Sequence, residues 1–212
     1  GDFVFHVDAL TDTDTVIKGS TLSNSSILIE YESESAVVKV GEDGTYSYTL
    51  PNTLPIGTKI TFNTKLQNEP IYNTKIIEIV YSGELVIDDA TKIVKFILEP
   101  ISINPILCPK ESELIINVTD SRIHSSDWKL YASINHDLSN GDDVLEKSII
   151  IKKDDEIIVL DDEPKLIYTG TDNGGVTKTT NVTFKEDEGI LLSINNPIKN
   201  NMVYTSIISY SI

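Results

Sequence analysis

Short segments in which apolar and polar residues alternate recur along the whole chain. Within residues 45–50, Tyr46, Tyr48 and Leu50 share one face of an extended strand, and the residues between them are polar. Residues 128–134 alternate in the same way. No segment combines a sustained apolar period of 3.6 residues with capping residues, so we expect few or no long helices. The pattern predicts an all-β fold.

Turn residues separate these segments at the spacing typical of β-sandwiches. Asp43-Gly44 and Asn173-Gly174 supply residues that adopt positive φ readily, and Asn195-Asn196-Pro197 marks a further turn. The predicted strands cover residues 27–31, 36–40, 45–50, 60–64, 76–81, 114–118, 128–134, 148–152, 156–160, 165–168, 180–184, 189–194 and 203–212.

The 212 residues suffice for two β domains that each bury a core of their own. We place the domains at residues 1–92 and 93–212. Asp88-Asp89 interrupts the alternating pattern before this boundary, and Pro100 follows it. The apolar run at residues 93–98 is short enough to be a linker or a strand of either domain.

The chain is acidic, with 33 Asp and Glu against 17 Lys and Arg and a formal net charge of −16. Arg122 is its only arginine. Such a surface repels phosphate backbones and anionic lipids, so we expect no nucleic-acid binding. No apolar run approaches the roughly 20 residues that a membrane-spanning helix requires, so membrane insertion is not expected either.

Cys108 is the only cysteine, so the chain cannot form an internal disulfide. It lies between Leu107 and Pro109 with no base nearby in the sequence, which predicts a buried structural thiol. A β protein almost free of cysteine fits secretion by a Gram-positive bacterium. The chain opens with Gly1-Asp2-Phe3, which is typical of a processed or a recombinant start; a processed start implies that a secretion signal has been removed.

Residues from about Val7 to Ile87 resemble the bacterial Ig-like domains of Gram-positive surface proteins. The resemblance includes Ile17-Lys18-Gly19, where Gly19 is expected to allow a tight bend after a strand, and Val38 through Tyr48 with the Asp43-Gly44 turn. It also includes Leu54 through Thr58, with Gly57 turning into the next strand. The resemblance implies an Ig-like β-sandwich that acts mostly as a spacer.

Residues from about Leu98 to the end are similar to the WxL domain of low-GC Gram-positive bacteria. Trp128-Lys129-Leu130 matches the first motif of that family, whereas Tyr210-Ser211-Ile212 replaces the second Trp-x-Leu motif. The resemblance implies a β-sandwich that attaches non-covalently to the cell wall through peptidoglycan.

Four residues are candidates for ligand binding: Trp128, Leu130, Tyr131 and Tyr210. Trp128 is either a stacking platform for a sugar ring or a core residue that packs on the same face as Leu130, and we favour the core. Tyr131 points to the opposite face, which makes it the better candidate for an exposed platform. Tyr210 is also expected in the core.

Acidic residues gather at predicted turns, where carboxylates from neighbouring loops could hold Ca²⁺. The candidates are Asp154, Asp155, Asp161 and Asp162, but solvated turn charge is the simpler interpretation. The three histidines are scattered and no zinc spacing exists. No nucleophile motif, phosphate loop or dinucleotide fingerprint is present, so we expect neither an enzyme nor a resident cofactor.

Together these observations predict a non-catalytic protein of the Gram-positive cell surface, whose partner is peptidoglycan or another surface protein. One alternative is an adhesin that binds a host or neighbouring protein through loops and an edge strand, without wall binding. A second is an accessory carbohydrate-binding module of a larger enzyme. A glycosidase would need two carboxylates at a defined separation, and the sequence does not single out such a pair.

Overall fold

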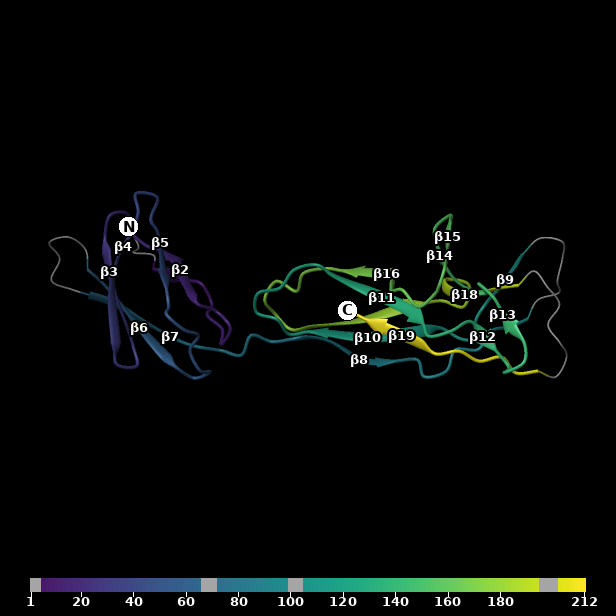
Figure 1. Ribbon diagram of the computed structural model, residues 1–212. Helices are drawn as coiled ribbons and strands as arrows, with labels where there is room; N and C mark the ends of the chain where they lie inside the picture. Colours follow the sequence, from purple (N-terminus) through teal and green to yellow (C-terminus); the bar gives the residue numbers. More distant parts are fainter. Residues whose placement is uncertain (1–4, 66–71, 99–104, 195–201) are drawn as a thin grey trace. The chain divides into compact units, whose positions relative to one another are not determined.

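The computed structural model describes residues 5–65, 72–98, 105–194 and 202–212, and none of these residues is helical (Figure 1). The all-β fold class expected from the sequence is thereby confirmed. The chain divides into two compact units, Gly1–Gly83 and Glu84–Ile212. The residues at the very start of the chain, Pro100 and the predicted turn at 195–197 lie outside the described residues.

The first unit is a sandwich of two antiparallel sheets. Its three-stranded sheet has the order β1-β2-β5, and its four-stranded sheet has the order β4-β3-β6-β7. The strands are β1 (His6–Val7), β2 (Val16–Ser20), β3 (Ser26–Tyr31), β4 (Glu34–Lys39), β5 (Thr45–Thr49), β6 (Lys59–Lys65) and β7 (Tyr72–Glu78).

The core of the first unit lies between these two sheets, with Ile17 and Tyr46 from one and Ile29 and Phe62 from the other. Gly19 is part of β2 and does not bend the chain as the sequence suggested. It is required for a different reason: a Cβ atom there would lie 2.1 Å from the carbonyl oxygen of His6. The predicted turns at Gly44 and Gly57 are confirmed by φ angles of 81° and 89°.

The second unit contains three larger antiparallel sheets and one small hairpin. The sheet orders are β17-β10-β8, β16-β11-β19 and β15-β14-β18-β9, and β12 pairs with β13. The strands are β8 (Leu85–Ala90), β9 (Ile106–Cys108), β10 (Leu114–Asp120), β11 (Trp128–Ile134), β12 (Leu138–Ser139), β13 (Val144–Leu145), β14 (Ile149–Lys153), β15 (Glu156–Val159), β16 (Lys165–Gly170), β17 (Lys178–Phe184), β18 (Gly189–Ile194) and β19 (Ile208–Ser211).

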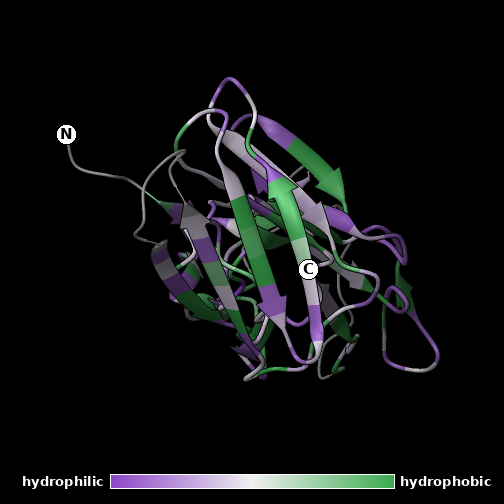
Figure 2. Ribbon diagram, turned by 90° about the vertical axis from the view of Figure 1, so that its left-hand side faces the viewer, coloured by the Kyte–Doolittle hydropathy of each residue, from purple (hydrophilic) through white to green (hydrophobic). Residues whose placement is uncertain are grey.

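All three larger sheets contribute to one hydrophobic core, which includes Val118, Leu130 and Ile190. Cys108 is buried in this core as a free thiol, as the sequence predicted. The hydropathy colouring shows apolar segments within the strands and hydrophilic residues in the connecting hairpins (Figure 2). Along β10 and β11 every second residue is buried, as expected for strands with one face on the core.

The structure departs from the expected strands at several places. Strand β8 continues through Asp88 and Asp89, because a register shift in its pairing with β10 accommodates an extra residue while both carboxylates stay exposed. Residues 84–92 therefore belong to the second unit, although the sequence placed them in the first. Residues 93–98 form no strand and only a single bridge from Phe96 to Lys110. The last predicted strand is shorter than expected and starts at Ile208.

Candidate functional site

The outer face of the sheet β16-β11-β19 is the strongest candidate for ligand binding, and Tyr131 lies at its centre. Tyr131 pairs in register with Leu166 on β16 and with Ser211 on β19. Cross-strand partners in register project to the same side of a sheet, so these three side chains form one row. Tyr131 and Leu166 are half-buried, and Ser211 is exposed.

Polar side chains flank this row on the same face. Two residues away along β11 in each direction, Ser133 pairs with Ser209, and Lys129 pairs with Thr169. Hydroxyl groups both donate and accept hydrogen bonds. The phenol ring of a tyrosine combines apolar contact area with a polar tip. The face therefore offers an apolar platform with hydroxyl groups around it, which suits the apolar faces and hydroxyl groups of a saccharide.

The other three predicted binding residues point to the opposite side of this sheet. Trp128 is 5% exposed and its ring lies 5.6 Å from that of Tyr168 in a tilted arrangement. Leu130 is fully buried. Tyr210 pairs in register with the buried Ala132. Of the four candidates, the structure places only Tyr131 on the outer face.

The interior position of Trp128 depends on the neighbouring strand. A Cβ atom at Gly170 would lie 1.9 Å from the indole ring, so only glycine leaves space for it. The hydroxyl of Tyr210 is buried and has no hydrogen-bond partner among the described residues, and burial raises the pKa of Tyr210 to about 12. Both aromatic residues therefore belong to the packing of the sandwich, as the sequence favoured.

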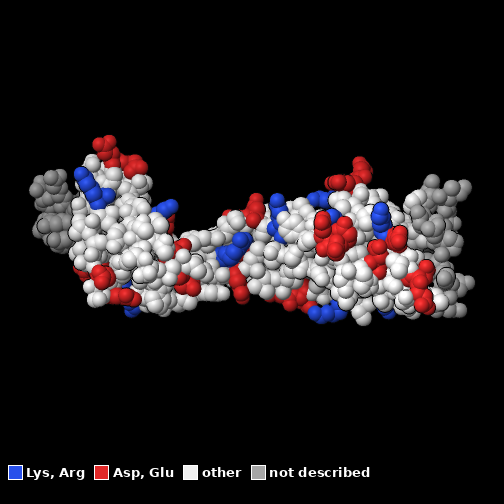
Figure 3. Space-filling model, in the orientation of Figure 1, with Lys and Arg blue, Asp and Glu red and all other residues white. Residues whose placement is uncertain are grey.

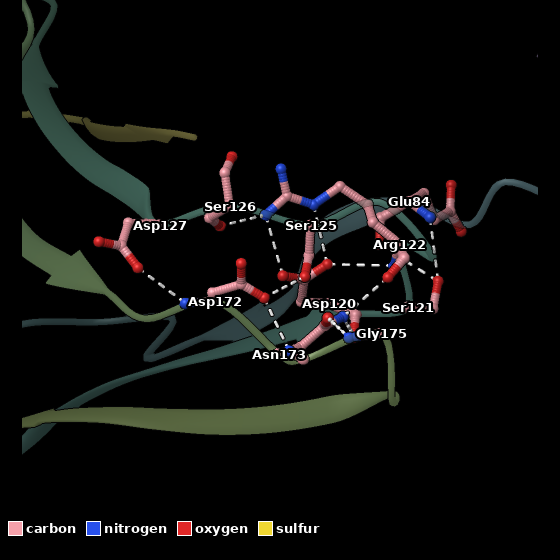
Figure 4. A network of polar contacts seen from close by, with 11 residues as sticks. Glu84, Asp120, Ser121, Arg122, Ser125, Ser126, Asp127, Asp172, Asn173 and Gly175 are labelled. Atoms are coloured by element: carbon pink, nitrogen blue, oxygen red, sulfur yellow. Dashed lines mark hydrogen bonds and ion pairs between the residues drawn. The ribbon is translucent and has the colours of Figure 1, made fainter. Parts of the chain in front are cut away.

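A second candidate lies at one end of this unit, where a polar network joins the loop at residues 121–127 to the loop at 171–177 (Figure 4). Arg122 donates to both oxygens of Asp120, at 2.9 Å each, and to the carbonyl oxygen of Ser126. The Asp120 side chain is 4% exposed. The hydrogen bonds from Arg122 hold the pKa of this carboxyl below its usual value.

The loop at 171–177 is fixed to the same network. The amide of Asn173 donates to the carbonyl oxygens of Asp120 and Arg122, at 3.0 Å each. Asp172 accepts from the hydroxyl of Ser125, which lowers the pKa of Asp172. Val176, in the same loop, is 71% exposed. The network thus holds two loops together and presents an exposed apolar residue beside them.

Lys110 is an unusual buried cation, with 1% of its surface exposed. Its Nζ donates to the main-chain carbonyl oxygens of Glu188 at 2.5 Å, Ile190 at 3.3 Å and Glu186 at 3.4 Å. Burial lowers its pKa to about 8, and the nearby carboxylates of Asp187, Glu186 and Glu188 oppose this shift. All three contacts are with the main chain, so this lysine anchors the turn before β18.

The predicted calcium candidates lie at two turns. Asp154 and Asp155 form the tip of the β14–β15 hairpin, where Asp154 has a φ of 53°. Asp161 accepts from the backbone N–H of Glu163 and lies 3.4 Å from Nζ of Lys165, and Asp162 is exposed beside it. Among the described residues, no group of three or more His, Cys, Asp or Glu side chains is arranged to hold a metal ion.

Sequence reasoning missed the roles of Lys110, Arg122 and Asn173. The only available signal was that Arg122 is the sole arginine, and nothing distinguished Lys110 from the other lysines. These roles depend on contacts between residues that are distant in sequence, such as Lys110 with Glu188.

Comparison with protein-family models and with curated proteins finds no match to this chain. Within the described part of the chain, no helix is long and apolar enough to cross a membrane.

Proposed function

We propose that this chain is a non-catalytic module of the Gram-positive cell surface that binds peptidoglycan through the outer face of the sheet β16-β11-β19. The observation that carries the proposal is the position of Tyr131, at the centre of a solvent-facing row with Leu166 and Ser211. The resemblance of the second unit to WxL domains and that of the first unit to Ig-like domains support the same role. In this proposal the first unit is a spacer.

The face suits a polymer better than a small molecule. Its residues come from three adjacent strands of one sheet, so the contact surface is broad and has rows of side chains along it. Hydroxyl groups on all three strands can bond successive sugar units, while Tyr131 supplies the apolar contact. No reacting group is needed for such binding, which is consistent with a non-catalytic module.

A sedimentation assay with purified peptidoglycan tests this proposal. We expect the 212-residue chain to be retained, and the Tyr131→Ala variant to bind about fivefold more weakly, because loss of an aromatic contact costs roughly 1 kcal/mol. Tyr81→Ala is the matched control, since Tyr81 is 53% exposed in the first unit and should not affect retention. If the unmodified chain is not retained, the proposal of wall binding fails.

An adhesin that binds a partner protein is a second candidate, favoured by the edge strand β15. Among the strands that the structure describes, this strand pairs with β14 alone, and it exposes Ile157 and Val159. An open edge with exposed apolar residues can accept an added strand from another protein. Binding to a panel of matrix proteins without binding to peptidoglycan would favour this candidate. Binding to soluble glycans instead of peptidoglycan would favour an accessory carbohydrate-binding module.

A further inference from the structure

An open groove on the first unit differs from the rest of this acidic chain. It has a volume of about 680 Å³ and is lined by the outer face of β1, β2 and β5 together with the end of β4. Acidic side chains are scattered over both units and outnumber basic ones on the face shown in Figure 3. The groove instead brings together Lys18, Lys39 and His6 against a single carboxylate, that of Asp8.

Strand register places the polar groups of the groove in two rows. Lys18 pairs with Ser47, and Ser20 pairs with both His6 and Thr45. Positions 18 and 20 of the same strand project to the same side, one pleat repeat or about 7 Å apart. A tetrahedral anion fits between two such rows and can contact groups from both.

The donors of the groove are available to a ligand. Neither Lys18 nor Lys39 has an ion-pair partner among the described residues, and the hydroxyls of Ser20 and Ser47 have no hydrogen-bond partner there. The only carboxylate in the lining, that of Asp8, lies 2.8 Å from Nε2 of His6. Two ammonium groups and two hydroxyls are therefore free to bind an anion.

The groove is also preformed by the sheet. The hydroxyl of Tyr46 donates to the carbonyl oxygen of His6 at 2.8 Å, passing over Gly19, which has no side chain to block it. The N–H of Asp8 donates to the carbonyl oxygen of Lys18 at 2.8 Å. These bonds fix β1 against β2, so a ligand would not have to order the backbone when it binds.

One further carboxylate, that of Asp43, lies beside the groove and accepts hydrogen bonds. Asp43 lies in the turn before β5, and its Oδ1 accepts from the N–H of Thr45 at 3.0 Å and from the hydroxyl of Thr45 at 2.8 Å. At physiological ionic strength, charges more than about 8 Å apart are largely screened. Asp43 keeps its negative charge, so attraction of an anion depends on its direct contact with Lys18 and Lys39, while the distant part of the net charge of −16 is largely screened.

The geometry points to a phosphate-binding site in this groove, for a phosphate group that is free or part of a larger molecule. Lysine binds phosphate as a point charge from a flexible stem, and hydroxyls complete the set of donors. Because the groove is open, a phosphate ester can be bound while the rest of its molecule extends into solvent. The site lies in the first unit and does not depend on the role of Tyr131.

Amide signals in an NMR titration of the full chain provide the test. We expect inorganic phosphate and glycerol 3-phosphate to shift the signals of Lys18, Ser20 and Ser47 in a saturable way, with dissociation constants of about 1 mM. Sodium chloride at equal ionic strength and glucose should not shift them. A preference for glycerol 3-phosphate over inorganic phosphate would identify an ester as the ligand, whereas equal binding would identify the free ion as sufficient.

Variants separate a built site from general charge attraction. Lys18→Met combined with Lys39→Met should weaken phosphate binding at least tenfold, and Asp8→Asn should strengthen it because a competing negative charge is removed. Lys59→Met is the matched control, since Lys59 is an exposed lysine of the same unit outside the groove. Equal binding by all variants, shifts that chloride reproduces, or tighter binding of glucuronate than of phosphate would each overturn the assignment.

Discussion

Lys110 and Arg122 are two cations of the second unit that stabilise turns in different ways. Arg122 pairs with the carboxylate of Asp120 and keeps 23% of its side chain exposed. Lys110 is almost fully buried, and its ammonium group donates to main-chain carbonyl oxygens. Arg122 therefore has a charged partner and access to water. The hydrogen bonds of Lys110 are to uncharged carbonyl groups, and its side chain is shielded from water.

The difference shows how burial and partner determine what a cation contributes. A partly exposed guanidinium keeps part of its hydration, and its carboxylate partner favours the charged form of both groups. A buried ammonium group loses its hydration, and the carbonyl dipoles compensate for only part of that loss. This explains why the pKa of Arg122 is raised beside Asp120, whereas that of Lys110 is lowered.

Removal of the Lys110 ammonium group should have the largest effect. Lys110→Met leaves carbonyl oxygens in a buried site without their donor, so we expect the free energy of unfolding to fall by about 3 kcal/mol. Urea unfolding followed by tryptophan fluorescence measures this, because Trp128 is the only tryptophan and lies in the core of the same unit. Lys152→Met, at an exposed lysine, is the control. A loss below 1 kcal/mol would contradict the anchoring role.

The pH dependence of the same variant sharpens the comparison. The pKa of Lys110 is about 8 in the folded chain, where the side chain is buried, and 10.5 when it is exposed in the unfolded chain. Between these two pH values the unfolded chain therefore binds more protons than the folded chain. Stability contributed by this group therefore rises with pH from 8 to 10.5, and we expect the difference between the wild type and Lys110→Met to widen by about 2 kcal/mol. Unfolding measured at pH 7.5 and 10 checks this.

Tyrosine ionisation acts in the opposite direction at high pH. The pKa of Tyr31 is raised to about 12, mainly by its hydrogen bond with Tyr48, and stability from this group is lost as pH rises above 10. The wild type and Lys110→Met share this effect, so it cancels in their difference. A difference that stays constant from pH 7.5 to 10 would show that Lys110 remains charged throughout.

Disruption of the Arg122 pair should have a smaller effect. Asp120→Asn removes the charge but keeps one hydrogen-bond acceptor, so we expect a loss of about 1.5 kcal/mol at pH 7. Because Arg122 lowers the pKa of Asp120, its contribution exists at neutral pH and is lost as pH falls through the folded pKa. The difference between the wild type and Asp120→Asn should therefore shrink in acid. Asp162→Asn, at an exposed carboxylate, is the matched control.

An effect of Asp120→Asn as large as that of Lys110→Met would remove the distinction between the two cations. Both variants can be followed in one series of urea titrations, since both residues belong to the second unit. Hydrogen exchange at Gly174 and Gly175 would add a local measurement, because their N–H groups bond to Asp172 and Asn173 within the network.

Prediction from sequence worked best where one face of a strand is buried and the other is exposed. Residues 128–134 form a strand with the predicted bounds, and their burial alternates without exception. Residues 189–194 also have the predicted bounds, although four consecutive residues from Gly189 are buried. Its apolar run does not alternate, so the bounds were predicted from the turn residues that flank it in the sequence.

Prediction was weaker where the pairing partner determined the structure. Strand β8 contains Asp88 and Asp89, and no local pattern indicates that a register shift with β10 accommodates them. The bend expected at Gly19 is absent, because that glycine makes space for Tyr46 instead. Each of these outcomes depends on a residue from a distant part of the chain.

The sequence by itself determined the all-β class, the inward direction of Trp128 and the outward direction of Tyr131. A strand has a period of two residues, so the direction of each side chain follows from its position relative to apolar neighbours. Only the tertiary structure decided that Leu166 and Ser211 lie beside Tyr131, that carbonyl groups enclose Lys110, and that Lys18 and Lys39 line one groove. Pairing between strands that are distant in the sequence brings such residues together, and the pattern within one strand does not specify which distant strand becomes its neighbour.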